Sequence, residues 1–316
     1  MEWYHWIIIV VAFIAINILA CGFFAFKALF SKKPGEGSFK DLDLSKTLYK
    51  EHDARIKEEF KFLESLPTEN VYIQSRDNYK LRGFYIPNNS DKTVFFVHGY
   101  RATPFNNFSW VARKMYDEGY NLFLIDQRTH GESGGKYTTF GLKERFDVVD
   151  WAHFINEKYS PKHIILYGMS MGCASSEMAL ELDLPSNVRC AILDCGFKDG
   201  FSLMVHNTKK YIKVGATLAV LAMNVFCKLI GKFSLFEASS EKALKNAKIP
   251  CFFIHGTNDK TVPFSHALAN YEACSTYKEC AWLEGVEHAL CYYEGYPDLE
   301  NRIIKFIDKA IKESEE

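Results

Sequence analysis

The segment 164–172 constrains the fold of this chain more than any other part of the sequence. It reads IILYGMSMG, so an apolar strand leads directly into a Gly-x-Ser-x-Gly pattern. This pattern is typical of a sharp strand-to-helix turn that exposes a nucleophilic serine, here Ser170, at the top of a sheet. Gly168 and Gly172 suit such a turn because closely approaching backbone leaves no room for Cβ atoms. The helix-like residues 173–180 supply the context that the motif requires.

Strand-like and helix-like patterns alternate through most of the chain. Short apolar runs predict strands near 71–74, 81–86, 93–97, 121–126, 163–167, 189–194, 250–254 and 280–283. Helical spacing of apolar residues predicts helices near 46–66, 106–118, 140–158, 171–182, 264–273 and 298–313. A β-hairpin followed by repeated strand–helix units indicates an α/β fold, with a mostly parallel sheet covered by helices on both faces.

Residues 197–247 interrupt this alternation. Within them, 214–227 carries no charge, and at this length it favours a buried or interfacial helix over a second membrane span. We interpret the region as a helical lid inserted over the active site, with ordinary extra core helices as the alternative. An apolar lid would favour acyl chains or membrane-borne substrates, which is a hypothesis, because core packing explains apolar residues equally well.

The N-terminal residues 1–30 are predicted to form a transmembrane anchor. From Trp3 to Phe26 the chain contains no Asp, Glu, Lys or Arg, a length that can span the ~30 Å hydrocarbon core as a helix. Lysines follow this helix and none precedes it, which predicts a single-pass protein of the cell membrane with its catalytic domain in the cytoplasm. Residues 31–45 read as a linker, and 46–316 as the catalytic domain.

Two other interpretations of the N-terminus are weaker. A cleaved signal peptide is disfavoured because no Lys or Arg precedes the apolar run. The segment 18–21, ending in Cys21, faintly resembles a lipoprotein cleavage site. However, the apolar stretch continues past Cys21 and lacks a basic leader.

Composition excludes several classes of partner. The formal net charge is −1, so no bulk field recruits nucleic acid. The nine cysteines form no C-x-x-C pair and no metal-ligand spacing, which suits a reducing compartment and predicts neither a metal nor a cofactor. The sequence does not indicate an oligomeric state.

The serine requires a base and a group that orients the base. With this motif the partners follow in the chain order serine, acid, histidine. Asp259 lies just after the apolar strand 250–254, and His288 follows the strand 280–283. Both loops leave carboxyl ends of strands, where open α/β sheets build their sites. We therefore predict a catalytic triad of Ser170, Asp259 and His288.

Other candidates for these roles have a weaker sequence context. His255 is expected to pack within its turn, and His266 to be solvated on a helix. His206 falls in the predicted lid, where it could contact substrate. Asp194 also ends a strand and is an alternative acid, but Asp259 has the better context.

A tetrahedral intermediate needs two preorganised hydrogen-bond donors for its oxyanion. The backbone N–H of Met171, directly after the nucleophile, is the first candidate. The second is the backbone N–H of Tyr100, in the loop that follows the strand 94–97, where Gly99 permits the turn. We expect His98 in the same loop to be structural.

Taken together, these motifs resemble the α/β-hydrolase superfamily, in particular serine hydrolases related to monoacylglycerol lipases and prolyl-oligopeptidase-like enzymes. The matching segments run from about residue 70 to the C-terminus and comprise 98–99, 126–133, 168–172, 255–259 with 262–263, and 287–288. In that family the loop 126–133 mainly shapes the pocket, and the first thirty residues correspond only to a variable anchor. The resemblance leaves the acyl and leaving groups open, because these relatives cleave esters, lipids, thioesters and peptides.

Three functions follow in order of preference. The first is a membrane-anchored serine hydrolase that forms an acyl-enzyme on Ser170 and cleaves a small-molecule carboxylic ester or lipid. The second is an aminopeptidase or amidase with the same machinery, which would need an acidic group to bind the substrate amine. The third is a non-catalytic scaffold that binds a ligand, against which an intact serine, acid and histidine argue.

Overall fold

The structure is a computed structural model that describes residues 2–32 and 49–316. Eight strands among the described residues form one sheet in the order β1-β2-β4-β3-β5-β6-β7-β8. Their bounds are β1 (Glu69–Gln74), β2 (Lys80–Ile86), β3 (Lys92–Val97), β4 (Asn121–Ile125), β5 (His163–Met169), β6 (Val188–Asp194), β7 (Cys251–Gly256) and β8 (Lys278–Leu283).

The sheet begins with antiparallel strands and continues with parallel ones. The β1–β2 and β2–β4 pairs are antiparallel, whereas every pair from β4 through β3, β5, β6 and β7 to β8 is parallel. All residues of β4, β5 and β7 are buried, as expected of strands covered on both faces. This arrangement confirms the predicted hairpin and mostly parallel α/β sheet.

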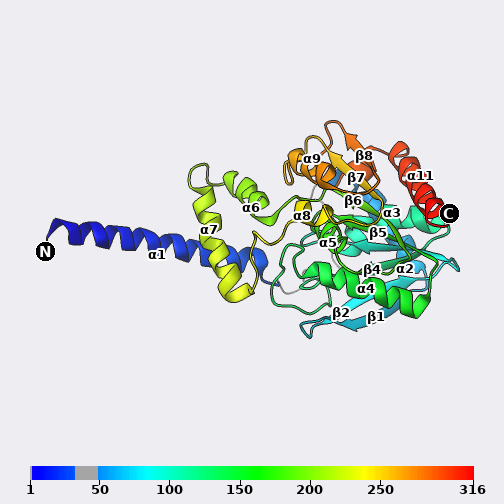
Figure 1. Ribbon diagram of the computed structural model, residues 1–316, viewed down its shortest axis with the longest axis horizontal. Helices are drawn as coiled ribbons and strands as arrows, with labels where there is room; N and C mark the ends of the chain where they lie inside the picture. Colours follow the sequence, from blue (N-terminus) through cyan, green and yellow to red (C-terminus); the bar gives the residue numbers. More distant parts are fainter. Residues whose placement is uncertain (1, 33–48) are drawn as a thin grey trace.

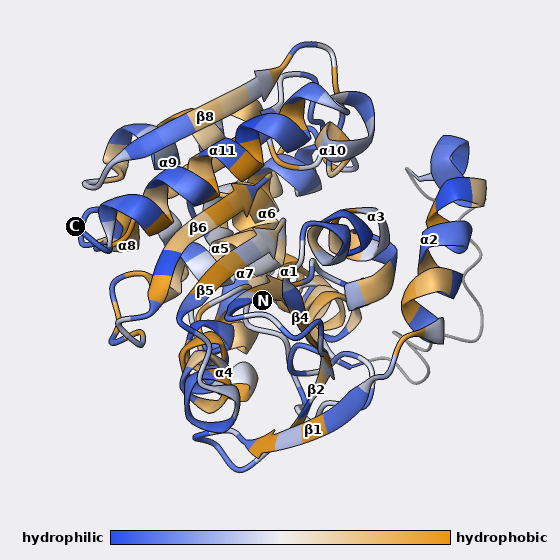
Figure 2. Cartoon of the chain, turned by 90° about the vertical axis from the view of Figure 1, so that its right-hand side faces the viewer, coloured by the Kyte–Doolittle hydropathy of each residue, from blue (hydrophilic) through white to orange (hydrophobic). Residues whose placement is uncertain are grey.

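Helices cover both faces of the sheet, and their apolar sides face the strands (Figures 1 and 2). One face packs against α2 (Asp53–Ser65), α3 (Pro104–Asp117), α10 (Cys291–Glu294) and α11 (Asp298–Glu313). The other packs against α4 (Glu144–Tyr159), α5 (Met171–Ala179), α8 (Ser240–Leu244) and α9 (Phe264–Ala273). Each face therefore has its own hydrophobic core.

Two helices begin later than predicted. The helix expected at 140–158 starts at Glu144, because Phe140 and Gly141 have positive φ angles of 52° and 91° that a right-handed helix cannot accommodate. The helix expected at 46–66 appears as a short 3₁₀ turn, η2 (Lys50–His52), followed by α2. The first residues of that expected helix, and the predicted linker from residue 33 onward, lie outside the described residues.

The 28-residue helix α1 (Trp3–Phe30) extends away from the globular body (Figure 1). By length and composition, it is the one helix in the described part of the chain that could cross a membrane. The region predicted as a lid contains α6 (Gly200–Lys209), α7 (Ala216–Phe226) and the π-helical turn η3 (Cys227–Gly231). A third core cluster joins this region to the end of α1 and to α5.

Candidate active site

Ser170 occupies a strained turn between β5 and α5. Its φ and ψ angles are 54° and −116°, a conformation that side chains rarely adopt. The flanking glycines are sterically required, since a Cβ at Gly172 would lie 1.9 Å from the Val97 carbonyl oxygen. A Cβ at Gly168 would lie 2.7 Å from a backbone atom of α5. The Ser170 N–H donates to the carbonyl of Asp194 on β6 (2.8 Å), so the neighbouring strand holds the turn.

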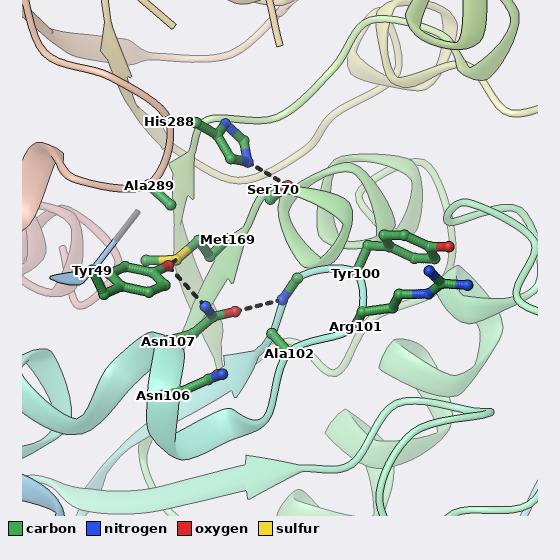
Figure 3. Close-up of a pocket in the computed structure, with 11 residues that line it drawn as sticks. Tyr49, Tyr100, Arg101, Ala102, Asn106, Asn107, Met169, Ser170, His288 and Ala289 are labelled. Carbon is green, nitrogen blue, oxygen red and sulfur yellow. Dashed lines mark hydrogen bonds between the residues drawn. The ribbon is translucent and has the colours of Figure 1, made fainter. Parts of the chain in front are cut away.

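The structure brings Ser170, His288 and Asp259 into one hydrogen-bonded chain. His288 Nε2 lies 2.9 Å from Ser170 Oγ, and His288 Nδ1 lies 2.6 Å from Asp259 Oδ2. Figure 3 shows the imidazole pointing toward the serine hydroxyl. Asp259 follows β7 and His288 follows β8, so the parallel strands deliver both groups to the same edge as Ser170. This geometry allows a proton on Nδ1 to be held by the carboxylate while Nε2 accepts the serine proton.

Several donors stabilise the Asp259 carboxylate. Oδ1 accepts hydrogen bonds from the backbone N–H groups of Thr261 and Val262, both at 2.8 Å. Burial alone would raise the Asp259 pKa, but hydrogen bonds from His255 and His288 outweigh it and hold the pKa well below its usual range. Asp259 is therefore ionised at neutral pH and can orient the imidazole.

The remaining histidines have other positions. His255 is buried, with Nε2 2.9 Å from the Val262 carbonyl oxygen, in agreement with a packed turn residue. His206 lies on α6, and its Nε2 is 3.0 Å from the Lys260 carbonyl oxygen. His98 is fully buried, and its ring nitrogens contact Gly99 O (2.8 Å) and the Gln127 N–H (3.0 Å).

The expectation that His266 is solvated is wrong. Its side chain is buried, because this face of α9 packs against the loop after β6, where the Lys198 N–H approaches Nδ1 at 3.3 Å. Burial lowers the pKa of His266 to about 4, so the ring is neutral at physiological pH.

Asp194, the alternative acid, lies under the site but is not hydrogen-bonded to His288. It is fully buried at the end of β6, and neither carboxylate oxygen has a hydrogen-bond partner among the described residues. Burial raises the pKa of Asp194 to about 7, and the nearby His255 and His288 oppose that rise only in part. The two carboxyl groups on neighbouring strands thus have opposite electrostatic environments.

The loop after β3 runs directly against the serine. A Cβ at Gly99 would lie 3.3 Å from Ser170 Cβ, so Gly99 permits this close approach. Asn107 anchors the loop, because its Oδ1 accepts from the Gly99 N–H at 2.8 Å. The Arg101 N–H donates to His130 Nε2 at 2.9 Å on the other side. Tyr100 is therefore held beside Ser170, and its N–H remains a predicted oxyanion donor.

Met171 is the first residue of α5, so its N–H belongs to the helix turn that lacks acceptors four residues earlier. It remains the other predicted oxyanion donor. Sequence reasoning missed Asn107 and Tyr49, whose hydroxyl accepts from Asn107 Nδ2 at 3.0 Å. A helical asparagine and a tyrosine far upstream belong to no motif, so no local signal marked them.

Two cavities meet at Ser170. The first, of about 500 Å³, has polar side chains on its wall, including Tyr49, Arg101, Asn106, Asn107 and His288 (Figure 3). The second, of about 460 Å³, is almost entirely apolar and includes Ala25, Leu29, Phe140, Phe197, Leu203 and Met204. Ser170 and Tyr100 line both, so the serine stands at the boundary between a polar and an apolar space.

Known proteins resemble this chain in sequence and in structure. A model of the alpha/beta hydrolase fold family matches residues 92–217. The uncharacterized protein YqkD of Bacillus subtilis is 24% identical over 251 residues, covering 79% of this chain and 82% of that protein. The mouse alpha/beta hydrolase domain-containing protein 17C is 29% identical over 196 residues, which cover 61% of this chain and about half (52%) of the mouse protein.

Among solved structures, the Pyrococcus furiosus esterase Pf2001 aligns with a TM-score of 0.64 and 26% identity, covering 78% of this chain and 92% of the esterase. The aligned fold, the matching family model and the strand–turn–helix at Ser170 agree with one another. The chain is a member of the α/β-hydrolase superfamily.

Proposed function

We propose that this hydrolase is a serine esterase that cleaves a carboxylic ester through an acyl-enzyme on Ser170. The observation that carries the proposal is the continuous hydrogen-bonded chain from Ser170 Oγ through His288 to the ionised Asp259. A serine hydroxyl becomes a competent nucleophile when an oriented base takes its proton. The likeness to an esterase supports the same reaction class.

The geometry accounts for each proton transfer. His288 Nε2 takes the proton as Ser170 Oγ attacks the ester carbonyl carbon, and the imidazolium is stabilised by Asp259. The N–H groups of Met171 and Tyr100 are the proposed donors to the oxyanion. When the intermediate collapses, the C–O bond to the alcohol breaks and the alcohol receives the proton from His288. A water molecule then attacks the acyl carbon while His288 takes its proton. The bond between that carbon and Ser170 Oγ breaks, Oγ receives the proton from His288, and the carboxylic acid leaves.

The two cavities suggest how an ester is oriented. The apolar cavity suits the acyl chain, since transferring apolar surface from water into such a space is favourable. The cavity with polar walls suits the alcohol portion, which can hydrogen-bond to Asn106, Asn107 or Tyr49. This arrangement favours an ester that combines an apolar acid with a polar alcohol.

An aminopeptidase or amidase is the second candidate. It would need a carboxylate to bind the substrate amine, yet no Asp or Glu is among the described residues that line either cavity. Burying an ammonium group without such a partner is costly. This absence favours the ester over the aminoacyl substrate.

We also propose that α1 anchors the protein in a membrane, with the catalytic domain in the cytoplasm. The helix has 28 residues, and about 20 apolar residues suffice to cross the hydrocarbon core. Its aromatic residues Trp3 and Trp6 lie at one end and Lys27 and Lys32 at the other, as at two membrane interfaces.

Hydrolysis of chromogenic substrates tests the proposed reaction. We expect the protein to hydrolyse p-nitrophenyl esters and to leave aminoacyl p-nitroanilides essentially intact. Ser170→Ala should reduce kcat by at least about 10³-fold. Ser176→Ala is the matched control, because its buried hydroxyl has no hydrogen-bond partner among the described residues. Equal ester turnover by Ser170→Ala and the unaltered protein would contradict the proposal.

A further inference from the structure

The end of α1 is part of the globular body. Phe26 and Phe30 are fully buried in the third core cluster. The Thr138 N–H donates to the Phe30 carbonyl at 2.9 Å, and the Tyr100 hydroxyl donates to the Leu29 carbonyl. These contacts fix the last turns of α1 against the loop beside Ser170. The helix is therefore a structural component of the site as well as a candidate anchor.

Helix α7 packs closely against the same part of α1. A Cβ at Gly22 would lie 2.7 Å from a backbone atom of Ala222, so only a glycine permits this helix crossing. Phe23 and Phe226 pack edge to face, with ring centroids 5.4 Å apart. Figure 1 shows α7 crossing α1 between the body and the N-terminus. The position of α7 thus depends on α1.

The apolar cavity runs between these elements. Ala25 and Leu29 of α1 line it together with Ser170 and Met171. Tyr211 and Ile212, on the connection between α6 and α7, line its outer part. The space therefore extends from the serine hydroxyl to the place where α1 and the α6–α7 connection leave the body.

The outer surface near Tyr211 and Ile212, where the apolar cavity reaches solvent, carries many exposed apolar side chains. Large hydrophobic side chains are exposed along the connection and on one side of α7 and η3, namely Tyr211, Ile212, Val214, Leu218, Leu221 and Leu229. Tyr211 is 88% exposed and Val214 is 90% exposed. Exposed lysines accompany them at 209, 210, 213, 228 and 232. Apolar residues bordered by lysines are typical of helices that lie in a membrane interface.

With α1 inserted in the bilayer as proposed above, its length places this surface at the membrane. About 20 residues cross the hydrocarbon core, and counting from Trp3 such a span ends near Gly22, where α7 crosses. In Figure 1 the α6–α7 connection also extends from the body on the side of the N-terminal part of α1. At the base of α1, a hollow of about 500 Å³ is lined by Lys27, Lys32 and Lys136, at the level of lipid headgroups.

We propose that α1 forms one wall of the acyl-binding site, and that the site opens into the bilayer. The occupant is the acyl chain of a single-chain lipid ester, which passes between α1 and the α6–α7 connection until its carbonyl reaches Ser170. The inference rests on the proposed esterase function and adds its substrate class and entry route. A chain that moves from bilayer to apolar cavity does not have to cross water, where its exposure would be unfavourable.

The test compares two esters with the full-length protein in phosphatidylcholine vesicles. These are soluble p-nitrophenyl butyrate and vesicle-embedded p-nitrophenyl palmitate. Ala25→Trp should fill the α1 wall of the cavity and lower the palmitate-to-butyrate ratio of kcat/KM about tenfold. Ala20→Trp is the matched control, the same substitution at an exposed position on α1, and it should retain the ratio.

A second variant addresses the opening without threatening the fold. Ile212→Glu places a charge at the half-exposed rim and should also lower the palmitate-to-butyrate ratio about tenfold. Labelling of Ser170 by a small fluorophosphonate shows whether Ala25→Trp is folded. If Ala25→Trp is not folded, Ile212→Glu alone tests the inference. Wild-type ratios in folded Ala25→Trp and in Ile212→Glu would overturn this inference while leaving the esterase intact. If the unaltered protein hydrolyses neither the butyrate nor the palmitate ester, both the proposed function and this inference are overturned.

Discussion

At the scale of single residues, the site depends on two carboxyl groups that neighbouring strands place in contrasting surroundings. Asp259 receives hydrogen bonds from two backbone N–H groups and lies beside two histidines, and its pKa falls. Asp194 is buried without comparable donors, and its pKa rises to about 7. Environment, and not residue type, therefore makes Asp259 the group that can orient His288.

Asp259→Asn should reduce kcat by about 10⁴-fold with little change in fold. The amide nitrogen would donate to His288 Nδ1, which moves the ring proton to Nε2 and prevents that atom from accepting the serine proton. Steady-state ester hydrolysis measures the effect, and circular dichroism checks the fold. Asp194→Asn is the matched control and should remain within about tenfold of the unaltered protein. Similar kcat losses in both variants would contradict the assignment of Asp259.

Asp194→Asn should stabilise the protein at high pH. Because the folded pKa lies above the unfolded value of about 3.9, the folded state binds the proton more tightly. The associated stability is fully present below about pH 4 and is lost as pH rises through about 7. The free energy of unfolding of the variant, minus that of the unaltered protein, should therefore be about 2–4 kcal/mol larger at pH 8 than at pH 4. Denaturant titrations of both proteins at pH 4 and pH 8 measure this difference. If the stability gained by the variant were the same at both pH values, Asp194 could not be a buried carboxyl with a raised pKa.

The sequence predicted the residues that belong to motifs and missed those that act through tertiary contacts. Ser170, Asp259 and His288 each follow a strand in a recognisable order, so their proximity could be anticipated. Asn107 and Tyr49 support the loop of Tyr100 only because α3 and the segment before η2 meet in space. His266 was misplaced because helical periodicity does not reveal that a loop covers that side of α9.

At the scale of elements, the close contact between β3 and the start of α5 shapes the turn at Ser170. Gly172→Ala should destabilise the protein by more than about 3 kcal/mol or prevent folding, because the Cβ would overlap the Val97 carbonyl. Gly119→Ala is a suitable control. Its φ of 82° is strained for alanine, but nothing lies within 4 Å of the added Cβ, so the cost should be about 1 kcal/mol. Thermal unfolding compares the two, and equal losses would contradict the steric requirement at the turn.

Element boundaries were predictable where the pattern is local. The strands appear close to their expected positions, because buried parallel strands are continuous apolar runs. The start of α4 was not predictable from periodicity, since it is set by positive φ angles in the preceding loop. The packing of α7 on α1 was also not predictable, because residues near 22 and 222 are brought together only by the complete fold.

At the scale of the whole molecule, α1 and the hydrolase body share one core cluster. Hydrophobic insertion of α1 predicts that the protein remains with neutral vesicles in 1 M NaCl, because salt screens charge interactions but not apolar burial.

Phe13→Arg, at an exposed position within the apolar run, should lower the bound fraction, since a charge near the bilayer centre costs about 3 kcal/mol. Vesicle flotation measures both fractions. Release of the unaltered protein by salt would indicate surface adsorption in place of a membrane span.

The central claim is that the fold converts Ser170 into a nucleophile. The most direct measurement is peptide mapping by mass spectrometry after reaction of the folded, full-length protein with a fluorophosphonate. The account predicts one covalent adduct, located on Ser170, that forms far more slowly in Asp259→Asn. An adduct on another residue, or a folded protein that remains unlabelled, would contradict it.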